Sequence, residues 1–490
     1  MPPAILLGTF EFHWQGCVLI SRLVRLNEER EAQKAWRLTK PGAAPVVEEI
    51  LKREFLKPAM ARDRESRELR FILRFAKSEV LYYRSQDSWA SLSLDGPIDR
   101  DLLPQLPILR KHHIHENFEA LKARRLPKGE RAFDSTRSSG TTGRPTKVLF
   151  SQHASLMFGL LAQRPHRWAR FDPSWKQAII RLPQDLPRRR DSSVLADGET
   201  CRSQGWQYIK LWFHTGPMVG FNRTNSADAQ VEWLRAERPQ FLVSFPGTLE
   251  ILVYASQGKP VDSLRALRSI SATLTEGMRD RVEQATRLPV YQSYGLNEIG
   301  IVAHRCESGR YHVNAEHCLV EIVDEAGSPC RAGETGRILV TGLTNYAMPL
   351  IRYDTGDLGV AMEGGCDCGR TLPSFGTVFG RYRPMHHAPE GTAGRVNLIQ
   401  RTIEELPLDA LTGLREYQLH QYRDESFELR LVIQDEGDNR LEEAVHKAWD
   451  TQKDNPPPLR IVRVGQVSAS PGGKQQEFTS DFFPPLHEKP

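Results

Sequence analysis

Long apolar runs are absent from this sequence of 490 residues. No stretch approaches the roughly 20 consecutive apolar residues that a membrane-spanning helix needs. The first residues, MPPAILLGTFEFHW, place no basic region before an apolar segment and reach Glu11 early. We therefore expect neither a transmembrane helix nor a secretory signal.

Cysteine is scarce, at seven residues, and the number is odd. Disulfide frameworks are typical of small secreted domains with an even number of closely spaced cysteines. The sequence does not fit that class, so we expect a reduced, cytoplasmic protein.

An excess of one charge is also lacking. The chain carries 66 Lys and Arg against 61 Asp and Glu, a net charge of +5. Proteins that bind nucleic acid or membrane surfaces usually carry a clustered basic face. We expect no such partner and interpret the local basic runs, Arg188–Arg190 and Arg164–Arg170, as solvated surface.

The length exceeds the roughly 250–300 residues of a single core, so more than one domain is expected. Residues 1–130 are predicted to be mainly helical, because apolar residues recur at helical spacing in Val46–Phe55 and Glu68–Phe75. Leu102–Pro107 is expected to be a loop that leads into a helix near Asn117–Ala123.

Residues 131–380 are predicted to form an α/β domain with a mostly parallel sheet, because short apolar segments alternate with helical ones. The expected strands are Lys147–Phe150, Ala178–Leu182, Gln240–Ser244 and Leu288–Gln292, with a helix at Ala227–Ala236. From about 305 to 380 the pattern changes to strands with tight turns, including Leu319–Val323 and Gly336–Thr341. This predicts a small β subdomain.

The last hundred residues are predicted to form a separate α+β domain, 381–490, with a boundary near Gly380–Pro384. Its expected elements are a helix at Asn397–Leu406, strands at Glu416–Tyr422 and Phe427–Gln434, a helix at Leu441–Trp449 and a strand at Leu459–Val467.

Residues 135–147 read STRSSGTTGRPTK. The glycines let the backbone turn and expose N–H groups, the hydroxyls can donate to phosphate oxygens, and Arg144 and Lys147 add positive charge. The Walker A spacing is absent. Taken alone, the segment fits either a phosphate-binding loop or an ordinary surface turn.

Further segments follow in a fixed order: YQSYGLNEIG at 291–300, RYDTGD at 352–357, Gly380-Arg381, and Lys474 after two glycines. Together with the loop they resemble the core motifs of the adenylate-forming (AMP-forming acyl ligase) superfamily, most of all its phenylacetate–CoA ligase-like branch with the CapK-type proteins. The resemblance covers roughly residues 100–490. It implies a large α/β amino-terminal portion and a small mobile carboxyl-terminal domain.

The resemblance implies a role for each motif residue around ATP. Tyr294 would lie against adenine, Asn297 near the α-phosphate, and Asp357 at the ribose hydroxyls, and Gly295 would be a further nucleotide-binding residue. Glu298 would coordinate Mg²⁺. Arg381 would contact ribose or phosphate at the hinge, and Lys474 would reach the α-phosphate when the last domain closes. The phosphate loop would comprise Ser138, Ser139, Gly140, Thr141, Thr142 and Gly143, with Lys147 beside it.

The implied reaction begins with attack of a small carboxylic acid on ATP and loss of pyrophosphate, which is catalysed by positioning and electrostatics. The acyl group then passes to a thiol, with coenzyme A expected first. A carrier protein, an amine, AMP transfer to a hydroxyl, and a non-catalytic zinc-stabilised nucleotide-binding protein remain alternatives. The sequence does not indicate the oligomeric state or the acid.

Three positions depart from the family pattern. Tyr382-Arg383-Pro384 stands where related ligases usually carry acidic residues, so adenylation is better supported than thioester formation. Arg144 replaces a usual lysine, and Asn297 a usual threonine or serine. An acyl pocket is expected between Gln240–Ser244, the turn at 245–247 and the Tyr294 loop. Its candidate residues, which could equally be core, are Phe213, His214, Phe245 and Pro246.

A second candidate site comprises Cys306, His312, Cys366 and Cys368. Three thiolates and one imidazole are a composition typical of tetrahedral structural zinc, although C-x-C is tighter than the usual knuckle. Some phenylacetate–CoA ligase-like proteins carry a similar set. The alternative is buried free cysteines, as expected for Cys318 and Cys330, and His304 and His317 are competing ligands.

Overall fold

The computed structural model describes most of the chain between residues 36 and 481. The described residues are 36–96, 98–133, 146–189, 193–256, 259, 261–272, 274–381, 406, 414–424, 426–433, 439–450, 457–465, 467 and 478–481. The expected phosphate loop at 138–143, Lys474 and nearly all of the helix expected at Asn397–Leu406 lie outside them.

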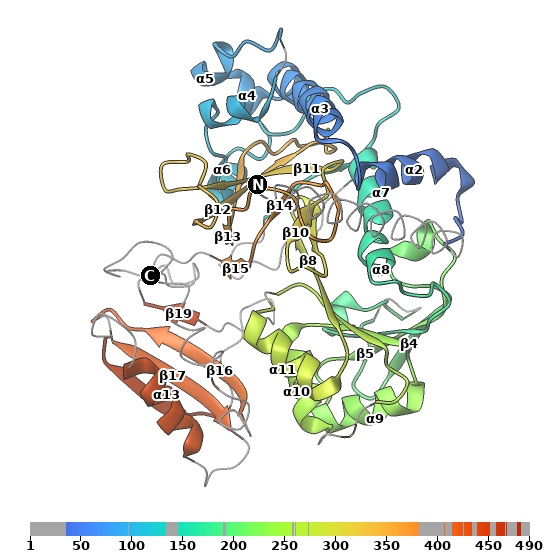
Figure 1. Ribbon diagram of the computed structural model, residues 1–490, viewed down its shortest axis with the longest axis vertical. Helices are drawn as coiled ribbons and strands as arrows, with labels where there is room; N and C mark the ends of the chain where they lie inside the picture. The colour runs from blue at the N-terminus through green and yellow to red at the C-terminus, as the bar shows by residue number, and fades with distance from the viewer. Residues whose placement is uncertain are drawn as a thin grey trace, which may run out of the picture.

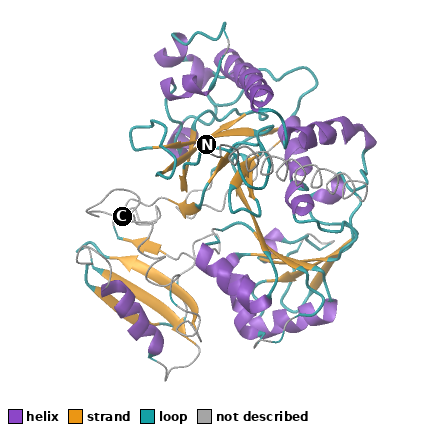
Figure 2. Ribbon diagram, in the orientation of Figure 1, coloured by secondary structure: helices purple, strands orange, loops and turns teal. Residues whose placement is uncertain are grey.

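A nine-stranded sheet forms the largest layer, in the order β14-β10-β9-β8-β7-β6-β3-β5-β4 (Figures 1 and 2). Its parallel centre consists of β3 (Gln177–Arg181), β5 (Met218–Asn222), β6 (Phe241–Ser244), β7 (Ala266–Ser269) and β8 (Val290–Leu296). Antiparallel strands extend it: β4 (Thr200–Ser203) at one edge and β9 (Gly300–Arg305), β10 (Tyr311–Val313) and β14 (Ser374–Phe375) at the other. The central strands are short and apolar because helices cover both of their faces.

Alternate side chains of these strands enter two different cores. One core packs strand residues such as Ala178 and Leu267 against α9 (Ala227–Glu237), α10 (Pro246–Ala255) and α11 (Glu276–Thr286). The other packs Ile179 and Ala266 against α7 (Gln152–Leu161), with α8 (Arg164–Trp168) following on the same side. The side chains alternate between the two cores because successive residues of a strand point to opposite faces of the sheet.

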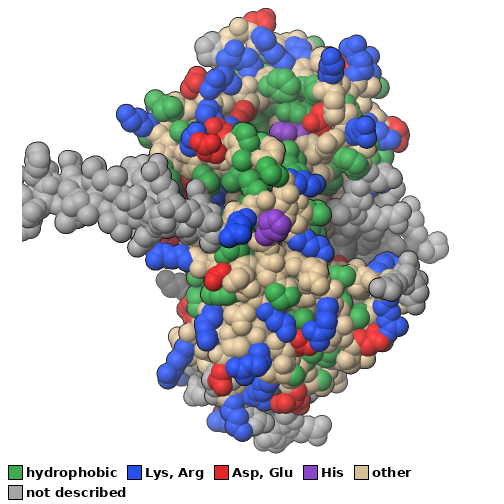
Figure 3. All heavy atoms as spheres, turned by 90° about the vertical axis from the view of Figure 1, so that its right-hand side faces the viewer, with side chains coloured by type: hydrophobic (Ala, Val, Ile, Leu, Met, Phe, Trp, Pro, Cys, Tyr) green, Lys and Arg blue, Asp and Glu red, His purple; other side chains and the backbone are tan. Residues whose placement is uncertain are grey.

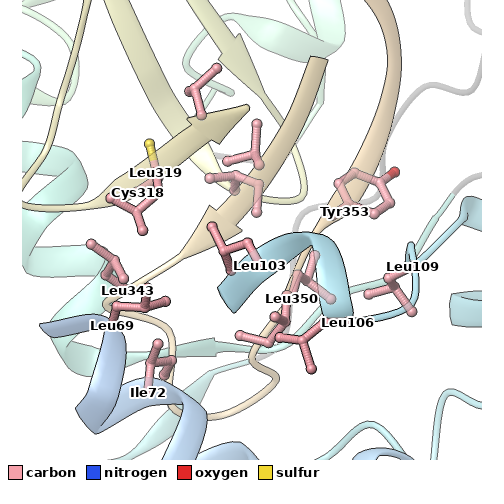
Figure 4. Close-up of a cluster of buried hydrophobic side chains, with 14 of the residues drawn as sticks. Leu69, Ile72, Leu103, Leu106, Leu109, Cys318, Leu319, Leu343, Leu350 and Tyr353 are labelled. Atoms are coloured by element: carbon pink, nitrogen blue, oxygen red, sulfur yellow. The ribbon is translucent and has the colours of Figure 1, made fainter. Parts of the chain in front are cut away.

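A second, four-stranded sheet carries the amino-terminal helices. It runs β11 (Cys318–Val323), β12 (Thr335–Gly342), β13 (Tyr353–Val360) and β15 (Val378–Arg381). Figure 4 shows Leu69 and Ile72 of α3 (Pro58–Glu79) packed toward Leu319 and Leu350. The other elements of this region are η1 (Pro41–Ala43), α2 (Ala44–Arg53), α4 (Leu81–Arg84), α5 (Asp87–Ala90), η2 (Arg100–Gln105) and α6 (Lys111–Glu116).

The stretch from 305 to 380 contributes to two sheets rather than one. Strands β10 and β14 belong to the large sheet, whereas β11, β12, β13 and β15 form the small one. Two three-residue 3₁₀ turns, η3 (Pro183–Asp185) and η4 (Ile209–Leu211), complete the large portion.

Two local predictions are wrong. Residues 100–105 form a 3₁₀ helix where a loop was expected, because the Asp99 side chain caps it by accepting from the backbone N–H of Asp101 at 3.0 Å. The next helix is α6, which ends at Glu116 instead of spanning Asn117–Ala123. The Asn117 amide donates to the carbonyl of His113 at 3.0 Å, a local bond that competes with helix continuation.

Near the phosphate loop, the expected strand at Lys147–Phe150 is reduced to β2 (Phe150–Ser151). It pairs with β1 (Ala132–Phe133), so a short antiparallel ribbon joins the two ends of the segment that contains the loop.

The carboxyl-terminal unit has its own sheet and core, as expected for an α+β domain. Its sheet runs β18 (Leu459–Arg463), β17 (Phe427–Ile433), β16 (Leu414–Gln421) and β19 (Phe478–Ser480), and α13 (Arg440–Asp450) packs Val445 and Trp449 on it (Figure 1). Among the described residues, no helix has the length and apolar character needed to cross a bilayer. The face in Figure 3 carries basic side chains over both halves, with acidic side chains interspersed among them.

Candidate functional site

Tyr294 and Asp357 join the two large sheets. The phenol of Tyr294, on β8, donates to Oδ2 of Asp357, on β13, at 2.7 Å, and both side chains are buried. Desolvation raises the pKa of Tyr294, and the charge of Asp357 raises it further. Residues that are 63 positions apart, one from each of two sequence motifs, therefore meet at one point.

The turn between β8 and β9 fixes Glu298. A Cβ at Gly295 would lie 2.9 Å from the carbonyl oxygen of Gly300, and Gly300 itself has φ +107°, so the turn requires both glycines. Glu298 is 8% exposed, and no described residue donates a hydrogen bond to its carboxylate. A buried carboxylate in this state suits a hard cation such as Mg²⁺. Asn297 beside it is exposed.

The turn before Asp357 is held by its own side chains. The backbone N–H of Gly356, at φ +74°, donates to Asp354, and the N–H of Asp357 donates to Thr355 Oγ1 at 3.1 Å. Arg381 of β15 is the cross-strand neighbour of Asp357, so the Gly380-Arg381 motif runs alongside the RYDTGD motif.

Thr146 and Lys147 contact the segment at 115–118, which precedes the expected phosphate loop in the sequence. The Lys147 ammonium lies 5.5 Å from the ring centroid of Phe118. Thr146, which is 1% exposed, shares a 3.0 Å hydrogen bond with His115 of α6. His115 thus holds Thr146, a contact that the sequence could not predict because only the fold brings the two residues together.

The four candidate metal ligands lie together. Their ligand atoms are all within 4.8 Å of one another, including 3.2 Å from His312 Nε2 to Cys368 Sγ and 3.7 Å from Cys306 Sγ to Cys366 Sγ. His312 Nδ1 lies 3.1 Å from the carbonyl oxygen of Leu372. A metal-binding histidine typically makes such a hydrogen bond with the ring nitrogen that does not bind the metal. The donor set fits tetrahedral zinc.

The competing ligands are engaged elsewhere. His304 Nδ1 lies 2.8 Å from Ser293 Oγ, and the two nitrogens of His317 lie within 2.7 Å of Thr344 Oγ1 and the carbonyl oxygen of Ile299. Cys318 is fully buried and Cys330 half-buried, away from the set.

A family model for "AMP-binding enzyme" matches residues 65–348, more than half of the chain. The chain belongs to the AMP-binding enzyme family. This confirms the resemblance to adenylate-forming, phenylacetate–CoA ligase-like proteins and the predicted fold class.

Curated relatives share this family at low identity. The phenylacetate-coenzyme A ligase of Thermus thermophilus is 26% identical over 327 residues, 65% of this chain and 69% of the relative. That of Pseudomonas putida is 24% identical over 404 residues, 78% of this chain and 85% of the relative. A crystal structure of 2-hydroxyisobutyryl-CoA ligase in the postadenylation state has a TM-score of 0.67 at 16% identity, covering 88% of this chain and 91% of that one.

The predicted acyl-pocket residues have different surroundings. Phe213 is 2% exposed and packs edge-on against Trp36 at 5.8 Å in an aromatic core. Phe245 is buried with the Arg223 guanidinium 5.3 Å from its ring centroid. Pro246 begins α10, and His214 is exposed.

Two arginines of the basic run at 164–170 are buried, contrary to expectation, whereas Arg170 is exposed. Arg164 is fully buried and pairs with Glu54 at 2.9 Å and Glu316 at 2.7 Å, and Arg167 is 5% exposed. Burial alone would raise the pKa of Glu54, but Arg164 and its basic neighbours hold it below its usual value. The physical reason is that carboxylates from two distant segments neutralise the charge of Arg164, and a sequence pattern does not reveal such partners.

Trp168 links this cluster to the metal ligands. Its Nε1 donates to Glu54 at 2.9 Å, the Arg370 guanidinium lies 4.2 Å from its ring centroid, and the His312 ring lies edge-on at 5.9 Å. The segment after α2 and the Cys366–Arg370 turn therefore both contact the indole of Trp168.

Proposed function

We propose that the protein uses ATP and Mg²⁺ to convert a carboxylic acid to its acyl-adenylate, with release of pyrophosphate, and then transfers the acyl group to coenzyme A. The observation that carries this proposal is the hydrogen bond between Tyr294 and Asp357, because it brings two motifs of the family together.

Each described motif residue has surroundings that suit its role. Ionised Asp357 is an acceptor, which suits the two hydroxyls of ribose. The phenol of Tyr294 orients that carboxylate, and the ring lies at the end of β8, where ligands of open α/β sheets usually bind. Arg381, the cross-strand backbone neighbour of Asp357, would contact ribose or phosphate.

Glu298 would hold Mg²⁺ with oxygens of the nucleotide. When bound, this ion neutralises charge on the phosphates. The protein contributes a carboxylate on a side chain that is 8% exposed.

The remaining roles rest wholly or partly on residues outside the described ranges. The loop at 138–143, with Lys147 at its end, would hold the β- and γ-phosphates. Lys474 would bring an ammonium to the α-phosphate, and residues 381–490 would act as a small lid domain over residues 131–380.

Coenzyme A is the proposed acceptor because the curated relatives are phenylacetate-coenzyme A ligases and the similar solved structure is a coenzyme A ligase. The departure at Tyr382-Arg383-Pro384 keeps a carrier-protein thiol, an amine or a hydroxyl as alternative acceptors. Adding each acyl acceptor to pre-formed adenylate and measuring AMP release separates the thiols from the amine, whereas AMP transfer to a hydroxyl gives an adenylylated product and no free AMP.

The test of the first step is pyrophosphate release from ATP and a panel of aliphatic and aromatic acids without an acceptor. We expect Lys474→Ala to lower this rate by about 10²-fold or more while leaving ATP affinity nearly unchanged. Lys447→Ala, an exposed position on α13, is the matched control. A wild-type rate in Lys474→Ala would refute the role of Lys474, and no pyrophosphate with any acid would favour a non-catalytic nucleotide-binding protein.

We also propose that Cys306, His312, Cys366 and Cys368 hold structural Zn²⁺. Four protein ligands leave no open position for water or substrate, so the ion would stabilise the fold and take no part in the reaction. The ligand atoms converge within 4.8 Å, which supports this proposal. Thiolate ligands also suit a reduced, cytoplasmic setting.

A further inference from the structure

Arg268 lies in the middle of the region where the acyl group is expected. It belongs to β7, which pairs with β6 on one side and β8 on the other, and its Cα partners are Val243 and Tyr291. The expected acyl pocket extends from the end of β6 to the Tyr294 loop that follows β8. Strand β7 therefore runs between its two walls.

The side chain of Arg268 points to the face of the sheet that α7 and α8 cover. Ala266, two residues earlier on the strand, belongs to the core on that face, and Ile270 packs against it two residues later. The guanidinium itself bonds to His166 of α8. Arg268 is half-buried.

The partners of this guanidinium are neutral. Nη1 donates to Nε2 of His166 at 2.9 Å, because Nδ1 of that ring lies 3.1 Å from the carbonyl oxygen of Ala162 and carries the proton. Nη2 donates to Ser293 Oγ at 3.4 Å, and that hydroxyl bonds to His304 Nδ1 at 2.8 Å. Nε is buried without a hydrogen-bond partner among the described residues.

A carboxylate is missing from this set. The described residues place no Asp or Glu within ion-pair distance of Arg268, and desolvation lowers its pKa to about 10. The fully buried Arg164 and Arg352 are paired, Arg164 with Glu54 and Glu316, and Arg352 with Glu321 at 3.1 Å. A desolvated cation without an anion is unfavourable, so Arg268 is preorganised for an anion that arrives from outside.

We infer that Arg268 is a specificity-determining residue that binds a second carboxylate on the acid substrate, which makes the substrate a dicarboxylic acid. The free N–H groups on Nη1 and Nη2 suit a carboxylate, which accepts two parallel hydrogen bonds from a guanidinium. One carboxylate of the acid is adenylated and the other pairs with Arg268. The inference rests on the proposed function and specifies its substrate class.

The test compares dicarboxylic acids of four to six carbons, and aromatic diacids, with the monoacid that has a methyl or hydrogen in place of the distal carboxylate. For wild-type protein we expect kcat/KM for pyrophosphate release to favour a diacid over its matched monoacid by about 50-fold or more, since an unanswered buried charge costs several kcal/mol. Arg268→Met should lose about 30-fold or more on the diacid and stay within about threefold on the monoacid. Arg268→Lys should keep part of the preference.

Arg281→Met is the control, because that buried arginine pairs with Glu250 at 2.6 Å and should leave the diacid preference unchanged. Equal turnover of diacids and monoacids by wild-type protein would overturn the inference and leave the proposed function standing. Equal losses on both acids in Arg268→Met would also overturn it, as a merely structural role. No pyrophosphate from any acid would overturn the proposed function, and the inference with it.

Discussion

Tyr294 is hydrogen-bonded to Asp357 at 2.7 Å, and this bond crosses from the nine-stranded sheet to the four-stranded one. Phe375 packs edge-on against Tyr294 at 6.1 Å and stacks on Tyr311 at 5.6 Å, so the phenol is held from its other side as well. The position of the proposed ribose acceptor is therefore set by residues from both sheets.

Tyr294→Phe removes the donor and keeps the ring. A hydrogen bond to a charged group contributes about 1.5–3 kcal/mol, so we expect KM for ATP to rise about tenfold or more with a smaller change in kcat. Steady-state pyrophosphate kinetics measure both. Tyr291→Phe, on the opposite face of the same strand, is the control. An unchanged KM for ATP in Tyr294→Phe would contradict the proposed role of Asp357.

Glu298→Gln removes the charge proposed to bind Mg²⁺ and keeps the size of the side chain. We expect kcat to fall by about 10²-fold or more and the Mg²⁺ concentration for half-maximal rate to rise. The melting temperature should change little, because no described residue pairs with this carboxylate. Glu307→Gln, which removes an acid paired with Arg370 near the metal ligands, is a charge-matched control. Wild-type Mg²⁺ dependence in Glu298→Gln would rule out the assignment.

Zinc content should be about one equivalent per chain in purified protein, the stoichiometry of a single tetrahedral Cys₃His site. The double variant Cys366→Ser/Cys368→Ser should lose the metal and unfold at lower temperature, because binding to such a site contributes free energy to folding. Elemental analysis and thermal unfolding measure these effects. Cys330→Ser, half-buried and outside the set, should keep both properties. Fully stable wild-type protein without metal would refute the site.

Acidification should destabilise the fold through buried neutral histidines. Desolvation lowers the pKa of His166 and of His317, so the unfolded chain binds more protons than the folded one below about pH 6.5. Stability should therefore fall between pH 7 and 5, with up to about 1.4 kcal/mol per pH unit from each histidine. Urea unfolding at several pH values measures the slope. His166→Gln should make it shallower, whereas exposed His446→Gln should not. Equal slopes in the two variants would contradict this origin.

The sequence predicts the long regular elements well. The spacing of apolar residues predicts α2, α9 and α13, and short apolar runs predict β3, β6 and β11. The reason is that the pattern of apolar residues reflects which faces of an element are buried. The resemblance to adenylate-forming enzymes also implies that Tyr294 and Asp357 lie near each other, around one nucleotide.

The sequence could not predict features that depend on distant partners. Arginine is usually a surface residue, and only the fold brings Glu54 and Glu316 to Arg164. Strand β14 has two residues, too few for any period, and is defined by its pairing with β10. The neutral surroundings of Arg268 are likewise assembled from α8, β8 and β9.

Trp168 gives the protein an optical reporter of its own chemistry. Its indole touches a cation, donates to a buried carboxylate and faces a ligand of the proposed zinc ion. Indole emission responds to nearby charge and to solvent, so departure of the ion would change the fluorescence of this residue. Adding a chelator and recording the emission would then report, in real time and without a label, how loss of the metal ion changes the surroundings of Trp168 and of the segment after α2.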